Sequence, residues 1–233
     1  PGLNVVWANA KGDIGWWAAA QLPLRPAGVN PNFILDGSSS EADKPGFVPF
    51  SANPQEENPS RGYIVSANHQ PVPACGIEIP GYYNLPDRAQ RLDQRLADAR
   101  VKWDLNNSRA LQLDNGSGYG PRLLKSLLPL LQTDISAEEQ VLLKQLANWN
   151  GDHTLNGVAP TLFNQLVYQL TDAAMRDELG DSFFDNLLAT RVLDVALPRL
   201  AADANSPWWD NRNTPAKEDR ASIVKAAWQA SLA

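Results

Sequence analysis

A neutral amide side chain stands just after a short β-branched segment in the first third of the chain. Residues 63–66 read Tyr-Ile-Val-Ser and predict a strand, and Asn68 follows it in the run Ser-Ala-Asn-His-Gln-Pro. An amide N–H at a strand end can donate a hydrogen bond to an oxyanion that develops during acyl transfer. A single asparagine more often satisfies a turn, so the residues alone leave both interpretations open.

Two nearby residues offer acid–base or anion-binding chemistry. His69 could act as a general base, but no Ser-His-Asp arrangement is readable around it, and we favour a hydrogen-bonding role. Arg88 follows Asp87 at the start of a predicted helix, where aspartate caps the helix. The guanidinium could bind a carboxylate through two hydrogen bonds, although a solvated charge is the more common outcome.

Metal chemistry has few candidate ligands in this sequence. The chain holds one cysteine, Cys75, and two histidines, so we expect no internal disulfide, no cysteine cluster and no histidine-ligated metal. Glu78 is the one acid between His69 and Pro86. A single carboxylate can complete a calcium site where backbone carbonyls supply the other ligands, but alone it is weak support for one.

Composition narrows the classes of partner. The chain has 233 residues, 43% of them hydrophobic, a net charge of −6 and a pI near 4.9. A basic surface for nucleic acid or anionic lipid is not expected, and no apolar run is long enough for a membrane span. A chain of this length can bury a sizeable core in one large or two small domains.

The composition of the chain, and with it the type of secondary structure predicted, changes near residue 86. Residues 1–86 are rich in proline and glycine and predict a strand-and-loop region, with a hairpin from strands at 3–9 and 14–22 and a loop over 23–61. Residues 87–233 predict an α-rich subdomain of five to seven helices. We expect helices over 87–102, 119–131, 141–149, 161–179, 182–202 and 218–232. The expected signals are a capping box at 136–139, a stop at Gly180, a kink or break at Pro198 and a cap at Thr214.

Two pairs of tryptophans allow a different class of function. Trp16 and Trp17 are neighbours in a predicted strand, so they face opposite sides and cannot both enter one core. Trp208 and Trp209 form the second pair. Exposed indoles could stack on sugars or peptides, which makes a binding module an alternative to an enzyme, although core packing is more common.

Several segments, in order along almost the whole chain, resemble the β-chain of the penicillin acylase family of N-terminal nucleophile hydrolases. They are Asn-Ala-Lys-Gly-Asp-Ile-Gly-Trp at 9–16, Leu-Pro-Leu-Arg at 22–25, Gly-Phe-Val-Pro-Phe at 46–50, Asn-Pro-Ser-Arg-Gly-Tyr-Ile-Val-Ser-Ala-Asn at 58–68, Asp-Arg-Ala-Gln-Arg-Leu at 87–92, Leu-Gln-Leu-Asp at 111–114, Leu-Leu-Pro-Leu-Leu at 127–131, Trp-Asn-Gly-Asp at 149–152 and Trp-Trp-Asp at 208–210.

The resemblance implies an α+β fold that forms part of a four-layer αββα sandwich. In that family, the first residue of the β-chain, usually serine, is released by self-cleavage of a precursor, and it hydrolyses an amide through an acyl-enzyme. The implied substrates are penicillins, cephalosporins or N-acyl-homoserine lactones, and the chemistry requires no cofactor. The implied location is the bacterial periplasm or the outside of the cell.

The same resemblance assigns roles to particular residues. Asn68 matches the oxyanion-hole asparagine, and Arg88 matches an arginine near the active site that orders the nucleophile and that asparagine. Pro31 falls where the family supplies a backbone carbonyl to a structural calcium ion. Glu78 falls close to the acidic ligand of that ion, with a local difference in spacing.

The first residue departs from the family pattern. Pro1 has no side-chain nucleophile, so we expect a fragment whose partners are the missing α-chain and the remaining β-chain segments of one precursor. Alone, this fragment should lack acylase activity. The alternative is a non-catalytic binding or scaffold module of the same ancestry.

Overall fold

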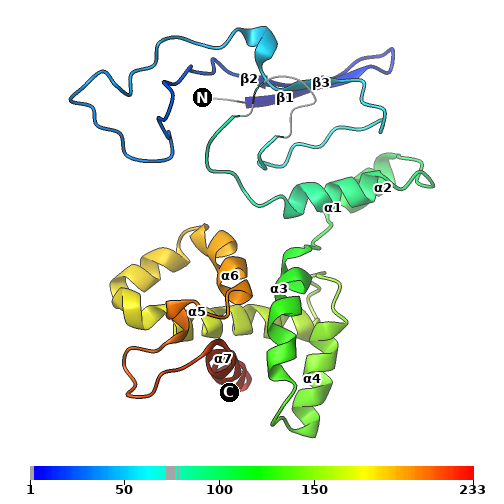
Figure 1. Ribbon diagram of the computed structural model, residues 1–233. Helices are drawn as coiled ribbons and strands as arrows, with labels where there is room; N and C mark the ends of the chain where they lie inside the picture. The colour runs from blue at the N-terminus through cyan, green and yellow to red at the C-terminus, as the bar shows by residue number, and fades with distance from the viewer. Residues whose placement is uncertain (1–2, 72–76, 78) are drawn as a thin grey trace. The chain divides into compact units, whose positions relative to one another are not determined.

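The computed structural model describes residues 3–71, 77 and 79–233, and it divides the chain into two compact units (Figure 1). Unit 1 ends at Asp104 and unit 2 begins at Leu105, so the division comes later in the chain than the change of composition at residue 86. Helix α1 (Asp87–Leu96) therefore belongs with the strands of unit 1. Strands in one unit and helices in both make the fold α+β, as the sequence predicts.

Unit 1 is built on a three-stranded antiparallel sheet in the order β1-β2-β3. Strands β1 (Leu3–Ala8) and β2 (Ile14–Ala19) form the expected hairpin. Its turn is closed by the Asn9 side chain, which accepts hydrogen bonds from the backbone N–H groups of Lys11 and Asp13, while Gly12 takes a φ of 92°. In β2, Trp16 is buried and Trp17 stacks on Trp7, so the two indoles face opposite sides as expected.

The third strand differs from the sequence prediction. Strand β3 (Gln55–Glu57) lies inside the stretch expected to be loop, and it pairs with β2 from Gly15 to Trp17. Its polar residues carry no strand signal, and the buried Asn53 holds it in place by donating hydrogen bonds to the carbonyls of Ala18 and Ala20. The strand predicted at 63–66 was wrong, because this segment pairs with no strand among the described residues.

Unit 2 is a helical bundle with its own apolar core. It contains α2 (Leu105–Gln112), α3 (Tyr119–Leu127), α4 (Ala137–Ala147), α5 (Val158–Leu188), α6 (Val192–Ala202) and α7 (Arg220–Leu232). Helix α5 packs most extensively against α7 and also contacts α4 and α6 (Figure 1). The core is lined by leucines, Phe163, Phe184, Trp209 and Trp228.

Most helix ends follow the expected signals. Ser136 and Glu139 form the capping box of α4. At Gly180 the backbone leaves helical geometry with a φ of 67°, so the helix breaks there as expected, and α5 continues beyond it as a second helical piece. The single helix expected over 182–202 was wrong, because α5 ends at Leu188 and α6 begins at Val192. Helix α6 contains Pro198. The predicted cap of α7 at Thr214 was wrong, because Asp219 accepts from the backbone N–H of Ser222, while Thr214 donates to Glu218.

None of the described helices combines the length and the apolar character that crossing a membrane requires.

Candidate functional site

Asn68 lies in unit 1 at a backbone position that few residue types adopt. Its φ is 58°, in the left-handed region where asparagine, aspartate and glycine are the residues most readily accepted. The preceding Ala67 is buried, whereas the Asn68 side chain is exposed. This conformation turns the chain sharply after 63–67 and places the amide at the surface of the unit.

Arg88, in the first turn of α1, fixes the orientation of this amide. Its Nη2 donates to Asn68 Oδ1 over 2.7 Å and to the backbone carbonyl of Ala67 over 2.8 Å. Because the amide oxygen accepts from the guanidinium, Nδ2 points away from Arg88 and keeps its two N–H donors for another partner. The two residues that the sequence singled out from separate segments are therefore in direct contact.

The segment that carries Asn68 is held at several points. The Tyr63 hydroxyl donates to the Asp93 carboxylate on α1 over 2.7 Å, which lays residues 63–67 along that helix. Asn4 in β1 donates to the Ser66 hydroxyl over 2.9 Å. Such contacts preorganise a donor, which is what stabilisation of a developing charge requires.

A wide cleft of about 1220 Å³ opens in front of Asn68. Its described walls come from β1 and the end of β2, from residues 66–71 and from the segment 79–84. The aromatic surface of the cleft comes from Tyr82, Tyr83, Phe47 and Phe50, and its polar groups include Asn4, Ser66 and Asn84. A donor at the wall of a cleft lined in this way can meet the polar atom of an otherwise apolar small molecule.

His69 lines the same cleft beside Asn68. Burial of the ring, together with the nearby positive charge of Arg88, lowers the pKa of His69 below its usual value of 6.5. The imidazole is therefore neutral at neutral pH. No hydrogen-bond partner of its buried Nδ1 occurs among the described residues, so the hydrogen-bonding role favoured from the sequence stays a prediction.

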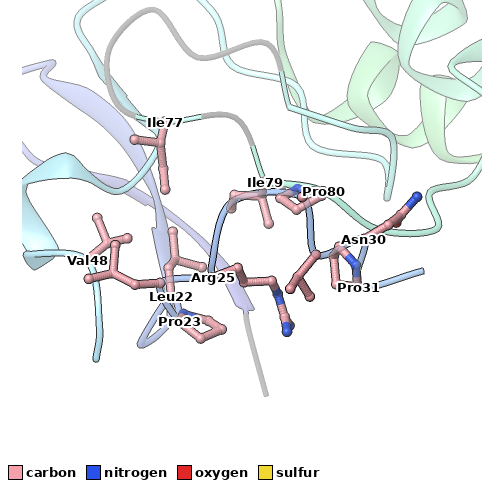
Figure 2. A pocket seen from close by; sticks show the side chains of 12 residues that line it. Leu22, Pro23, Arg25, Asn30, Pro31, Val48, Ile77, Ile79 and Pro80 are labelled. Carbon is pink, nitrogen blue, oxygen red and sulfur yellow. The ribbon is translucent and has the colours of Figure 1, made fainter. Parts of the chain in front are cut away.

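Pro31 lies in a second hollow of unit 1, an apolar pocket of about 540 Å³ (Figure 2). No carboxylate occurs among the described residues that line it, and the described part of the chain contains no cluster of three acidic, histidine or cysteine side chains suited to a metal. Glu78, the proposed acidic ligand, lies outside the described residues. The calcium site at Pro31 and Glu78 therefore stays a prediction.

Comparison with known proteins identifies the family of this chain. A sequence model of the penicillin amidase family matches residues 1–233. The chain belongs to the penicillin amidase family. This agrees with the resemblance carried by the motifs along the sequence, among them the segment 58–68 that ends at Asn68.

Two relatives of this penicillin amidase family member show which acylases it is similar to. The acyl-homoserine lactone acylase QuiP of Pseudomonas aeruginosa is 27% identical over 252 residues, which cover 99% of this chain and 29% of that protein. Penicillin acylase 2 proenzyme of Pseudomonas sp. strain SE83 is 25% identical over 233 residues, 98% of this chain and 29% of the relative. The chain thus spans about three tenths of the length of the curated relatives it matches.

The fold agrees with that of a solved acylase. Thermostable penicillin G acylase from Alcaligenes faecalis superposes with a TM-score of 0.73 at 19% sequence identity, over 99% of this chain and 46% of that one. At this identity the likeness concerns the fold alone. The superposition covers both units of the chain and supports the α+β assignment.

The sequence prediction named Asn68 and Arg88 but missed much of their surroundings. The backbone N–H of Asn84 donates to the backbone carbonyl of Asn68. Both Asn84 and the nearby Tyr82 come from a proline-rich stretch without periodicity. Arg25 lies in the Leu-Pro-Leu-Arg motif at 22–25, for which the sequence predicts no role, and it lines the apolar pocket. The sequence feature that could have indicated a role for Arg25 is its position as a single cationic residue among apolar residues and prolines.

Proposed function

We propose that this chain is a segment of an amidohydrolase that cleaves acyl amides, with Asn68 as a donor to the oxyanion. The observation that carries the proposal is the Arg88–Asn68 contact, which leaves Nδ2 of the amide available at a cleft wall. The family match over the whole chain supports the reaction class. The names of the relatives support two substrate classes, N-acyl-homoserine lactones and penicillins.

In this reaction a nucleophile attacks the acyl carbon, and the carbonyl oxygen gains negative charge as the tetrahedral intermediate forms. Asn68 Nδ2 donates to that oxygen, while Arg88 holds the opposite end of the amide. Loss of one such donor removes about 3–4 kcal/mol of transition-state stabilisation. Asn68 touches the reacting oxygen and is the proposed catalytic residue, and Arg88 is a positioning residue.

The remaining machinery belongs to segments outside this chain. We infer an N-terminal nucleophile released from a precursor, an α-chain and further β-chain segments, because the chain spans about three tenths of its curated relatives. One of those relatives is itself described as a proenzyme. The 233 residues alone are expected to be inactive, and export to the periplasm is part of the proposal by family resemblance.

The test is hydrolysis of a panel of acyl amides by the complete protein with and without Asn68→Asp. Aspartate keeps the shape and tolerates a positive φ, and its oxygen still accepts from Arg88, but it has no N–H donor. We expect the activity to fall by about 10²–10³-fold in kcat, with the fold retained by circular dichroism. Asn68→Gly, which also relieves the backbone but removes the side chain, should lose activity comparably.

A second candidate function is a binding or scaffold module of the same ancestry. The aromatic wall of the cleft favours it, since Tyr82, Phe47 and Phe50 are all largely exposed there. The residue at the processing junction upstream distinguishes the two: serine, threonine or cysteine supports the enzyme. Full activity of the complete protein carrying Asn68→Asp would overturn the role of Asn68.

A further inference from the structure

The apolar pocket that contains Pro31 has an unusual distribution of charge. Its described lining is made of aliphatic residues, prolines, a glycine and Asn30, and Arg25 is the one ionisable side chain among them. Arg25 is half-buried and forms no ion pair with a described residue. Among the described residues, the guanidinium therefore has no carboxylate partner, and its five N–H donors can bind an anionic group.

The pocket also has two chemically distinct parts. Figure 2 shows the side chains of Leu22, Val48 and Ile77 gathered at one end, with the guanidinium of Arg25 extending on the side away from Ile77. A molecule that fills such a space needs an apolar body and a single anionic group. The volume of about 540 Å³ lies within the range of small-molecule sites.

The pocket adjoins the cleft in front of Asn68. Leu22, Pro23 and Ile79 line both hollows, so the same side chains form a shared wall. The two hollows are therefore neighbours in unit 1. Because the pocket adjoins the cleft, a product of the proposed reaction is a suitable candidate for its ligand.

We propose that the pocket binds a carboxylic acid with an aliphatic chain, with the carboxylate paired to Arg25 and the chain packed against Leu22, Val48 and Ile77. Its place in the reaction rests on the proposed function. Hydrolysis breaks the amide C–N bond, water supplies a hydroxyl to the acyl carbon and a proton to the amine, and the acid released is a carboxylate at neutral pH. The pocket is then a product subsite beside the catalytic amide.

The first experiment measures binding to the 233-residue protein by titration calorimetry, with octanoate as the probe. The controls are 1-octanol and octylamine, which keep the chain and change the charge, and acetate, which keeps the charge and removes the chain. Octanoate should bind saturably and at least tenfold more tightly than any control. Equal binding of octanoate and octanol, or no saturable binding of octanoate, would overturn the proposal.

The second experiment uses matched variants with octanoate as the ligand. Arg25→Gln should weaken binding about tenfold, the usual effect of losing one charge-assisted hydrogen bond, and Arg25→Lys should recover part of the loss. Lys11→Gln, an exposed change of equal charge in the hairpin turn of the same unit, should leave binding unchanged. Equal weakening by Arg25→Gln and Lys11→Gln would contradict an ion pair in the pocket.

These measurements need no catalytic activity, so the two proposals can fail separately. Octanoate binding that depends on Arg25, together with an inactive complete protein, would retain the site and reject the proposed function. An active complete protein whose octanoate binding ignores Arg25 would do the reverse.

Discussion

The two units of this chain are stabilised in different ways. Unit 2 contains a continuous cluster of twenty buried apolar residues that runs through α3 to α7. In unit 1 the described buried apolar residues are few and scattered: Trp16, Ala18, Leu22, Ala67 and Ala89. Side chain-to-backbone hydrogen bonds organise unit 1 instead, from residues such as Asn9, Asn53 and Arg88.

This difference coincides with the location of the candidate site. The candidate site lies in the unit whose loops are fixed by polar contacts, and those contacts set the direction of individual donors. Apolar packing is non-directional and would not orient an amide. A unit with its own core, by contrast, needs no precise polar geometry to stay folded. The comparison predicts that substitutions of the same kind will act differently in the two units.

The largest effect is expected from removing core volume in unit 2. Leu166 is completely buried and Leu155 is fully exposed, so the same change to alanine tests burial alone. Leu166→Ala should destabilise the helical unit by about 3–5 kcal/mol, through lost transfer energy and the remaining cavity. Leu155→Ala should change it by less than about 0.5 kcal/mol. Urea unfolding followed by far-ultraviolet circular dichroism measures both, and equal effects would contradict a separate core.

A smaller effect is expected from a polar deletion in unit 1. Asn53 is fully buried, and its amide donates to the carbonyls of Ala18 and Ala20. Asn53→Ala should cost about 2 kcal/mol, because buried acceptors lose their donor. Hydrogen exchange at the backbone N–H of Ala18, which pairs with the Pro54 carbonyl, should become faster. The exposed Asn156 provides the control, and unchanged exchange at Ala18 in Asn53→Ala would show that unit 1 does not depend on this amide.

The smallest effect concerns an acidic pair in unit 2. Burial, followed by the hydrogen bond to Asp177, raises the pKa of Glu178 from 4.5 to about 7. Because the folded state holds this proton more tightly, the stabilisation is complete below pH 4.5 and is lost as the pH rises through about 7. Asp177 also accepts from the backbone N–H of Arg212, so the pair connects α5 to the loop before α7.

Glu178→Gln removes the titrating proton and leaves a permanent N–H donor in its place. The variant should lose the decline in stability between about pH 5 and about pH 8 and gain about 1 kcal/mol at the higher pH, after allowance for solvent screening. Denaturant unfolding at both pH values measures the difference. Glu138→Gln, the same change at an exposed acid, should keep the slope of the parent protein. A slope that Glu178→Gln leaves unaltered would show that the titration of Glu178 does not set the pH dependence of stability.

The sequence predicted well those features that local patterns determine. The hairpin of β1 and β2, the capping box of Ser136 and the apolar faces of the helices follow from turn residues and periodicity, and all are present. The likeness of motifs pointed to Asn68 and Arg88, which are in contact in the structure, and their roles stay predictions.

The remainder depends on partners that are distant along the chain. Strand β3 exists because Asn53 and Asn58 bond to β2, although Gln-Glu-Glu is not a strand-forming sequence. Residues 63–66 favour a strand by type, yet Tyr63 is bound to Asp93 on α1 instead. Contacts of this kind cannot be read from spacing, and neither can the two hollows, which combine loops and strand ends from across unit 1.

The break at Gly180 allows the long helix α5 to fit within the small volume of unit 2. A straight helix of the 31 residues of α5 would extend about 46 Å at 1.5 Å per residue. A compact body with as many residues as unit 2 has a radius of gyration of about 14 Å, and therefore a diameter of about 36 Å. An unbroken rod would protrude from it. One residue free of a Cβ divides the rod into two pieces, each short enough to fit, and allows Leu170 and Phe184 to share a single interior.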